Sequence, residues 1–246
     1  MAARQTLTSV YNQSNFVGAR SPCPYTFEIM IFDAEVFQIT VLSLQISAFA
    51  TGLSLFIGLP FGTLLALGKF PFRSFLLSMV NTGMGLPPVV VGLFVAMMLW
   101  RSGPLGDLRL IYTPSAIIIA QVIISFPVVT GLTAAALQSL DPRLRLQLYG
   151  LGASRPQMIW MLWREARLPL LAALMAGFGS VISEVGASMM VGGNIRYQTR
   201  VLTTAIVLET SKGNFDIAIA LGVLLLTITF LVNWALTWIQ QRGARR

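Results

Sequence analysis

Charged residues are scarce in this sequence. Asp, Glu, Lys and Arg together make up 11% of its 246 residues, whereas they make up about a quarter of an average soluble domain. Hydrophobic residues make up 55% instead, and they gather in long runs. Long apolar runs of this kind indicate membrane-spanning helices, so the sequence predicts an all-α integral membrane protein.

Histidine is absent, and Cys23 is the single cysteine. The absence of histidine removes the imidazole that most often binds metals and shuttles protons. A lone cysteine cannot form a disulfide within the chain, and Cys23 belongs to no C-x-x-C pattern. We therefore expect no metal centre, no cofactor and no redox site.

The formal net charge is +8, from 17 basic and 9 acidic residues. The basic residues stand in short clusters between the apolar runs rather than along one polar face. This pattern favours membrane topology over nucleic-acid binding. We expect lipid around the chain and no nucleic-acid partner.

Five apolar runs approach or exceed the roughly 20 residues that a helix needs to cross a bilayer. They extend from about Phe37 to Leu67, Phe75 to Trp100, Pro114 to Leu137, Leu168 to Ile182 and Ile217 to Ile239. The fourth run is short and meets Glu184, so either Glu184 turns into a protein interior or the span ends early. A further run, Val201 to Leu208, is too short to span and predicts a re-entrant or surface helix.

Lys and Arg residues are distributed unevenly over the two sides that five spans create. Ten lie on one side and seven on the other, and the positive-inside rule places the richer side in the cytoplasm. The N-terminus is then outside, with residues 1–33 as an external tail that lacks the apolar core of a signal peptide. The C-terminus is inside. Residues 34–246 form the transmembrane domain, and residues 139–168, approximately, form its longest cytoplasmic connection.

This cytoplasmic connection has helical periodicity on both sides of a break. Leucines repeat at helical spacing before the segment GLGAS, and a second apolar stripe follows Pro156, which a first helical turn tolerates. The pattern predicts a helix, a turn and a second helix. Two interpretations stay open: an amphipathic hairpin anchored at the headgroups by Trp160 and Trp163, or a docking surface whose glycine elbow admits another protein.

The stretch GLGASRPQMIWMLWREARLPLL, Gly150 to Leu171, resembles the coupling-loop motif of ABC importer permeases. That motif places a glycine after a Glu-Ala-Ala sequence and before an aliphatic residue and a Leu-Pro pair. Here Gly152 matches the glycine and Leu162 the aliphatic residue, whereas the Glu-Ala-Ala positions read Leu-Gln-Leu and Leu-Pro comes about one helical turn late. The resemblance implies that a cytoplasmic ATPase subunit contacts Gly152, Ala153, Ser154 and Arg155.

Four further segments are similar to the permeases of tungstate importers, which are relatives of the molybdate permeases. They are GLPPVVVGL (85–93), RSGPLG (101–106), SEVGASMMVGGNIRYQTR (183–200) and LTTAIVLETSKGNFDIAIALG (202–222). This similarity covers nearly everything from about Phe37 onward. It implies a homodimeric five-span permease in the cell (inner) membrane, which is a transport subunit and not an enzyme. It also implies two cytoplasmic ATPase subunits and an external binding protein that delivers tungstate or molybdate.

The energy source separates this interpretation from the alternative of an ion-driven secondary carrier or channel. The nearest approach to a phosphate-binding loop, GTLLALGKF (62–70), has the wrong glycine spacing and no Ser or Thr after Lys69, so we expect ATP hydrolysis in a partner. A secondary carrier normally buries ionisable groups near the midplane. Spans one, two, three and five carry no acid at their centres, which favours the ATP-driven permease and leaves the carrier as the alternative.

The segment between spans four and five offers hydroxyls, amides and arginines that suit an oxyanion. Together with two prolines of span two, it supplies the predicted substrate path or gate: Pro87, Pro88, Glu184, Ser188, Gly192, Gly193, Asn194, Arg196, Thr199, Arg200, Thr203 and Thr204. A simpler interpretation is a glycine turn followed by headgroup-anchoring arginines and a short capped helix. We expect Glu184 and Glu209 to pair with Arg196, Arg200 or Lys212 and so to hold the shape of the gate.

Overall fold

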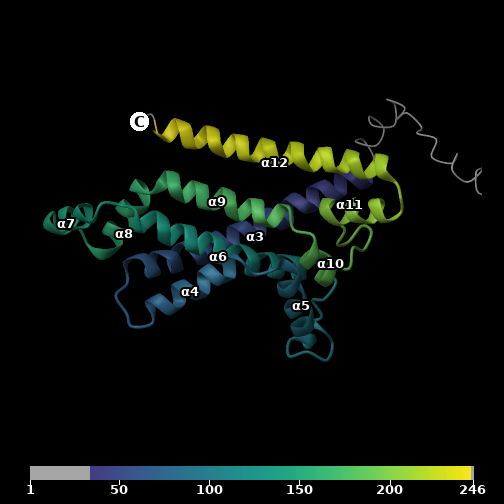
Figure 1. The fold of residues 1–246 in the computed structure, drawn as a ribbon, viewed down its shortest axis with the longest axis horizontal. Helices are drawn as coiled ribbons and strands as arrows, with labels where there is room; N and C mark the ends of the chain where they lie inside the picture. Colours follow the sequence, from purple (N-terminus) through teal and green to yellow (C-terminus); the bar gives the residue numbers. More distant parts are fainter. Residues whose placement is uncertain (1–33, 245–246) are drawn as a thin grey trace, which may run out of the picture. The chain divides into compact units, whose positions relative to one another are not determined.

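The computed structural model describes residues 34–244, and every regular element in that range is a helix (Figure 1). The all-α prediction is confirmed for this part of the chain, whereas the predicted external tail lies outside the described residues. The helices are α3 (Ala34–Leu67), α4 (Arg73–Met84), α5 (Pro88–Leu99), the 3-10 turn η2 (Gly106–Leu108), α6 (Pro114–Gln138), α7 (Pro142–Gly150), α8 (Arg155–Glu165), α9 (Arg167–Ile182), α10 (Gly186–Gly192), α11 (Leu202–Ser211) and α12 (Phe215–Ala244). The chain divides into two compact units, Met1–Phe37 and Gln38–Arg246, and the packing described below is that of the second.

Three helices are long and apolar enough to cross a membrane by themselves, namely α3, α6 and α12. Two further candidates are bent pairs: α4 and α5 meet at 102°, and α8 and α9 meet at 73°. The described residues therefore give three spans, or up to five if each bent pair is one span. The count of five and the orientation remain predictions.

The second predicted span is not continuous, because the chain breaks between Met84 and Pro88. Pro87 is extended, with φ −61° and ψ 123°, and Pro88 opens α5. A proline lacks the N–H that continues a helix and disfavours helical geometry in the residue before it. The two consecutive prolines thus turn an apparently uniform apolar run into two short helices.

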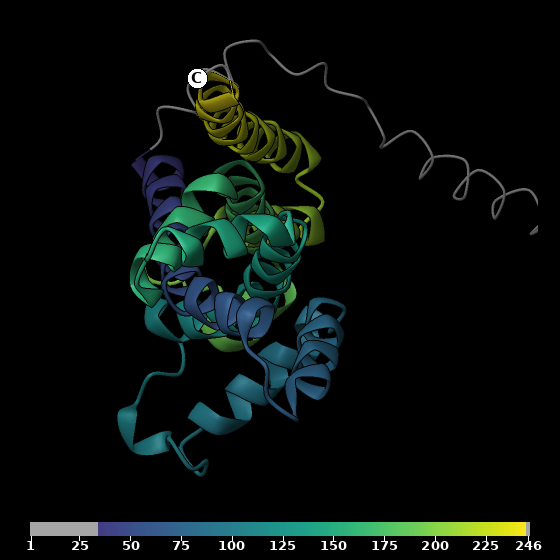
Figure 2. The same cartoon turned by 90° about the vertical axis from the view of Figure 1, so that its left-hand side faces the viewer.

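Helix α6 is the main packing partner of the other helices in residues 38–246, and both α3 and α9 contact it. It packs against α4, α5, α9 and α10. A Cβ on Gly62 of α3 would lie 2.7 Å from the Thr130 carbonyl oxygen, and one on Gly177 of α9 would lie 2.7 Å from the Val129 side chain. Small residues permit such close helix approach in membranes, where lipid supplies no hydrophobic driving force between helices. Figure 2 shows the chain from the side on which α7 and α8 lie in Figure 1.

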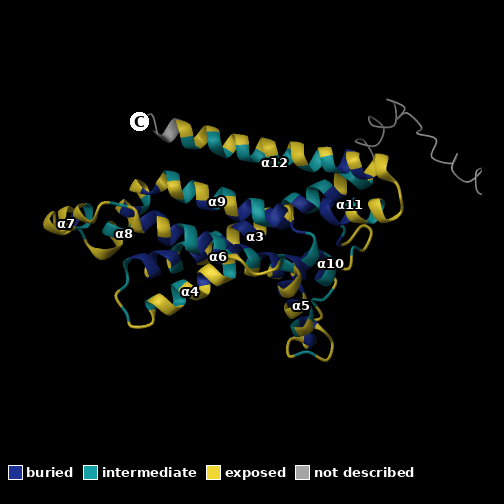
Figure 3. Cartoon of the chain, in the orientation of Figure 1, coloured by how far each residue is buried: buried dark blue, intermediate teal, exposed yellow. Residues whose placement is uncertain are grey.

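Two apolar clusters stabilise opposite ends of α3 and α6. One gathers Ile46 with residues of α5, α6 and α10, and the other gathers Leu65 with residues of α4, α6 and α8. Burial is concentrated between these helices, while α12 exposes much of its apolar surface (Figure 3). An exposed apolar helix of this length is suited to lipid contact. The α7–α8 turn lies near the second cluster and the α10–α11 segment lies near the first.

Candidate functional site

The turn between α7 and α8 is built around Gly152. Its φ is +75°, a left-handed conformation that glycine adopts without steric cost. The Gly152 N–H donates to the Tyr149 carbonyl at 3.0 Å, and the Ala153 N–H donates to the Leu148 carbonyl at 3.0 Å. These two bonds form a Schellman motif, which satisfies the last carbonyls of α7. A Cβ at Gly152 would meet nothing within 4 Å, so another molecule can approach the backbone closely here.

Ser154 begins the second helix of the turn. Its N–H donates to Gln157 Oε1 at 2.9 Å, which satisfies an amide that the helix leaves free, and α8 starts at Arg155 with Pro156 in its first turn. The predicted helix, turn and helix are thus confirmed. Around the turn, several large apolar side chains are exposed: Leu146, Tyr149, Leu151 and Trp160. Exposed apolar groups gathered in this way mark an interaction surface.

Buried side chains attach helix α8 to the rest of the chain. Leu162 is 1% exposed and packs in the same cluster as Leu65 of α3. The indole Nε1 of Trp163 donates to Thr63 Oγ1 of α3 at 2.9 Å. A force applied to the turn is therefore transmitted to α3 through packed side chains and one hydrogen bond.

The break between α4 and α5 borders a pocket of about 350 Å³. Three of the residues predicted from the sequence for the substrate path meet there, because Pro87, Pro88 and Glu184 all line it. Ser180 and Ser183 of the α9 end line it as well, and the remaining walls are apolar or glycine. The other predicted path residues do not line this pocket; they lie on α10, on α11 and in the segment between them.

Glu184 lies between α9 and α10 and is 7% exposed. Its Oε1 accepts a hydrogen bond from the Ala187 N–H at 2.8 Å, and its carbonyl oxygen accepts one from Thr203 Oγ1 of α11 at 2.9 Å. Within residues 34–244 it makes no ion pair, so the expected pairing with Arg196 or Arg200 is wrong. The carboxylate serves instead to satisfy a backbone amide at the start of α10.

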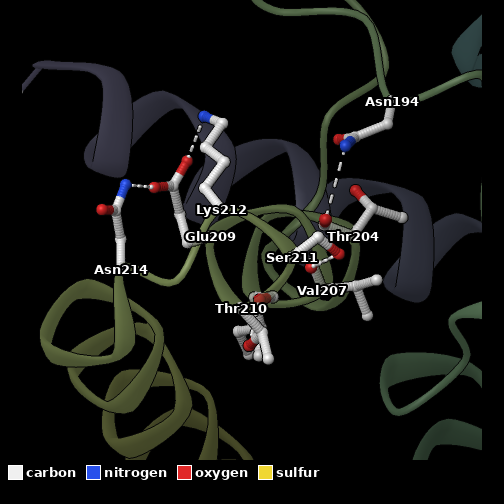
Figure 4. Close-up of polar contacts among 9 residues, drawn as sticks. Asn194, Thr204, Val207, Glu209, Thr210, Ser211, Lys212 and Asn214 are labelled. Carbon is white, nitrogen blue, oxygen red and sulfur yellow. Dashed lines mark hydrogen bonds and ion pairs between the residues drawn. The ribbon is translucent and has the colours of Figure 1, made fainter. Parts of the chain in front are cut away.

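The segment from α10 to α11 is held by its own polar groups. Gly193 has φ +68°, and a Cβ there would lie 2.7 Å from the Tyr112 ring. Thr199 Oγ1 donates to the Gly192 carbonyl and accepts from the Ile195 N–H. The Asn194 side chain donates to the Thr204 carbonyl at 3.4 Å, as Figure 4 shows.

These hydrogen bonds show which groups the hydroxyls of the predicted path contact. Thr199 and Thr204 are fully buried, and each of them bonds to main-chain groups of its own segment. Ser188 Oγ is buried without a hydrogen-bond partner among the described residues. The hydroxyls of Thr199 and Thr204 thus stabilise the segment itself, while Arg196 is exposed and Arg200 is half-buried.

Glu209 at the end of α11 is the second acid of this region. Its carboxylate accepts from Asn214 Nδ2 at 2.8 Å and from Lys212 Nζ at 2.6 Å (Figure 4). The expected pairing of Glu209 with Lys212 is therefore confirmed. The Asn214 amide, then the Lys212 ammonium, hold the pKa of Glu209 below its usual value. Arg196 stacks on the Tyr197 ring, with its guanidinium carbon 4.8 Å from the ring centre.

Sequence reasoning missed Gln121 of α6, which is 3% exposed in the middle of an apolar helix. Its Nε2 donates to the Val181 carbonyl near the end of α9 at 3.4 Å, and its Oε1 has no partner among the described residues. A lone amide within the run IIIAQVIIS was the available signal, since a polar residue inside a span is expensive unless it has a role.

The comparisons with known proteins agree with this geometry. Residues 58–245 match the protein family described as binding-protein-dependent transport system inner membrane component. A probable anion ABC transporter permease protein of Haloferax volcanii is 42% identical over 201 residues, which are 80% of this chain and 87% of that protein. The tungstate uptake system permease protein TupB of Peptoclostridium acidaminophilum is 38% identical over 213 residues, which are 87% and 93% of the two chains. Among solved structures, a bacterial ABC transporter involved in the import of alginate has a TM-score of 0.70 at 21% identity and covers 91% of this chain and 85% of its own, which shows a shared fold.

Proposed function

Because the chain belongs to the family of binding-protein-dependent transport system inner membrane components, we propose that it is the permease of an ATP-driven oxyanion importer. The proposed substrate is tungstate, with molybdate second. Two relatives support this class, since one is described as an anion permease and the other as a tungstate uptake permease. The family is one of transport components, in agreement with the expectation of a multi-pass membrane subunit rather than an enzyme.

The observation that carries the ATP-driven mechanism is the Gly152 turn. It offers an open glycine backbone amid exposed apolar side chains, and α8 ties it to α3 through Trp163 and Thr63. This arrangement suits a groove of a cytoplasmic ATPase subunit, whose closure would move the spans as rigid bodies. Gly152, Ala153, Ser154 and Arg155 are the proposed contact residues.

The proposed assembly has a second copy of this chain, two ATPase subunits and an external binding protein, all in the cell (inner) membrane or at its surface. In this assembly the N-terminus is outside and the C-terminus inside. The pocket at Pro87, Pro88 and Glu184 is the proposed part of the substrate path. It lies at the break between α4 and α5, which together make one candidate membrane span. Irregular backbone at membrane depth is tolerated where it lines a cavity.

Arg196 and Arg200 are proposed to guide the anion toward the path. Planar guanidinium groups match the geometry of oxyanions better than lysine ammonium groups do. Exposed charges act over about 8 to 10 Å near physiological ionic strength, so this guidance weakens as salt is added. If Arg196 and Arg200 instead anchor lipid headgroups, their contribution to uptake should not depend on salt in this way.

The test is uptake of labelled tungstate, molybdate and sulfate by cells that carry the full transporter. We expect ATP-dependent uptake with tungstate ahead of molybdate. We also expect the Arg196→Gln/Arg200→Gln double variant to take up less than wild type, with the deficit larger at low salt than at high salt. Arg109→Gln, which removes an exposed arginine from another loop, is the matched control. Indifference to all three oxyanions would contradict the proposed substrate class. Uptake that continues in liposomes without ATP would instead favour an ion-driven carrier or channel.

A further inference from the structure

Glu184 lies between two cavities, and its hydrogen bonds do not by themselves account for this position. It lines the pocket of about 350 Å³ at the α4–α5 break and also a second, much smaller cavity. The second cavity has an open volume of about 10 Å³, room for roughly one water molecule, and its polar walls include Ser47, Gln121 and Thr203. Among the described residues, Glu184 alone lines both spaces.

The Glu184 carboxylate is fixed in this position. The Ala187 N–H holds Oε1 at 2.8 Å, and Thr203 Oγ1 holds the residue's carbonyl oxygen at 2.9 Å. The side chain is 7% exposed, so bulk water solvates it poorly. A carboxylate held in this way cannot swing out of the pocket wall unless α10 or α11 moves.

The charge of Glu184 is not balanced within its surroundings. Within residues 34–244, no basic residue lines either cavity and Glu184 makes no ion pair. The other residues at the break are apolar, glycine or serine. An uncompensated charge in a poorly solvated site acts on other ions more strongly than the same charge in water. A negative charge on Glu184 would therefore oppose the entry of an anion at the break.

We propose that Glu184 is the charge that prevents the closed permease from leaking oxyanions. This inference rests on the proposed function, since only an anion importer needs such a barrier between transport cycles. The repulsion is present while α9, α10 and α11 are held together at Glu184, and it falls when the gate separates them. Glu184 thus determines selectivity in the closed state and positions the gate; it does not bind the substrate.

The experiment measures leakage through the assembled transporter, that is, permease with its ATPase, in liposomes without ATP and without binding protein. Labelled molybdate reports the anion and labelled rubidium reports a cation. Glu184→Gln keeps an oxygen that can accept from Ala187 but removes the charge. A loss of about 1.4 kcal/mol of repulsion speeds passage about tenfold, so we expect molybdate leakage to rise at least about tenfold with rubidium leakage unchanged.

Three further variants separate charge from structure. Glu184→Asp keeps the charge, and we expect it to stay tight to molybdate. Ser183→Lys, at an exposed position in the same pocket, leaves Glu184 in place but adds a neutralising cation, and we expect it to leak molybdate. Asp216→Asn removes the same charge from an exposed position at the start of α12, outside both cavities, and is the matched control; we expect no leakage from it.

Several outcomes would overturn the inference. A tight Glu184→Gln transporter, equal leakage of molybdate and rubidium, or equal leakage by the Asp and Gln variants would show that the charge is not the barrier. If Glu184→Gln does not assemble, a tight Ser183→Lys transporter would contradict the inference by itself. Failure of the proposed function is distinct, because the wild-type assembly would then show no ATP-dependent uptake with the binding protein present.

Discussion

Replacement of Gly152 by tryptophan tests the proposed coupling directly. At φ +75° any side chain is strained, at a cost of about 1 to 2 kcal/mol, but no atom of the chain lies within 4 Å of the new Cβ. The chain should therefore fold with a modest loss of stability. The indole would fill the open space through which the ATPase subunit approaches the turn.

Gly213 provides a matched control for this change. It has φ +79°, it follows the end of α11, and a Cβ there also meets nothing within 4 Å. Gly213→Trp thus introduces the same strain and the same bulk far from the α7–α8 turn. If the blocked contact contributes about 2 kcal/mol to docking, Gly152→Trp weakens ATPase association roughly 30-fold, whereas Gly213→Trp leaves it unchanged.

Co-purification of the ATPase and substrate uptake are measured together for both variants, after thermal unfolding has shown that the two are equally stable. We expect Gly152→Trp to lose ATPase association and substrate uptake in parallel. Normal ATPase association and normal uptake by Gly152→Trp would refute the coupling assignment, and the turn would then belong to the lipid surface.

Three other predictions follow from the described residues. A reporter fused after Arg246 should be cytoplasmic and one inserted near Asp107 external; the reverse labelling would contradict the charge-based orientation. Trp163→Phe should cost about 1 kcal/mol by removing the hydrogen bond to Thr63, and it should reduce uptake more than Trp234→Phe, whose exposed indole on α12 serves as the control in the same assays. Hydrogen bonds hold the pKa of Glu209 below 4.5, so the charged Glu209 stabilises the fold fully above pH 4.5, and this stabilisation is lost as the pH falls through the lowered pKa. The difference in melting temperature between wild type and Glu209→Gln should therefore shrink as the pH falls below 4.5. A difference that grows at low pH would contradict this reasoning.

Local signals made the α7–α8 turn predictable from the sequence. Gly152 and Pro156 act on the backbone at their own positions, so a helix end and a helix start can be recognised without knowledge of what packs nearby. The prolines at the α4–α5 break were equally visible, but their consequence was underestimated. The sequence showed a kink in an apolar run, whereas the 102° bend depends on how both halves pack against α6 and α10.

Contacts between distant segments could not be predicted in the same way. Trp163 and Thr63 are separated by 100 residues, and nothing in either neighbourhood specifies the other. The expected pairing of Glu184 failed for a related reason. Opposite charges nearby in sequence suggested an ion pair, but the free amide of Ala187 lies three residues away and satisfies the carboxylate first. That the other predicted path residues contact an oxyanion remains a prediction.

Helix α3 physically connects the two proposed sites. At one end Thr63 accepts the hydrogen bond from Trp163 of α8; at the other, Ser43 Oγ accepts one from the Leu202 N–H of α11 at 2.8 Å. Twenty residues of helix between them correspond to about 30 Å, close to the thickness of the hydrocarbon core.

The next residue of α11, Thr203, holds the carbonyl of Glu184. A movement of the α7–α8 turn can thus reach Glu184 at the break through helix α3 and three hydrogen bonds. Pro60 is the weak point of that helix, because it removes one backbone bond close to Thr63. A shift of α3 that breaks the Ser43–Leu202 contact would free α11, and Glu184 would then move with it, so that coupling to the ATPase and removal of the anion barrier become one motion.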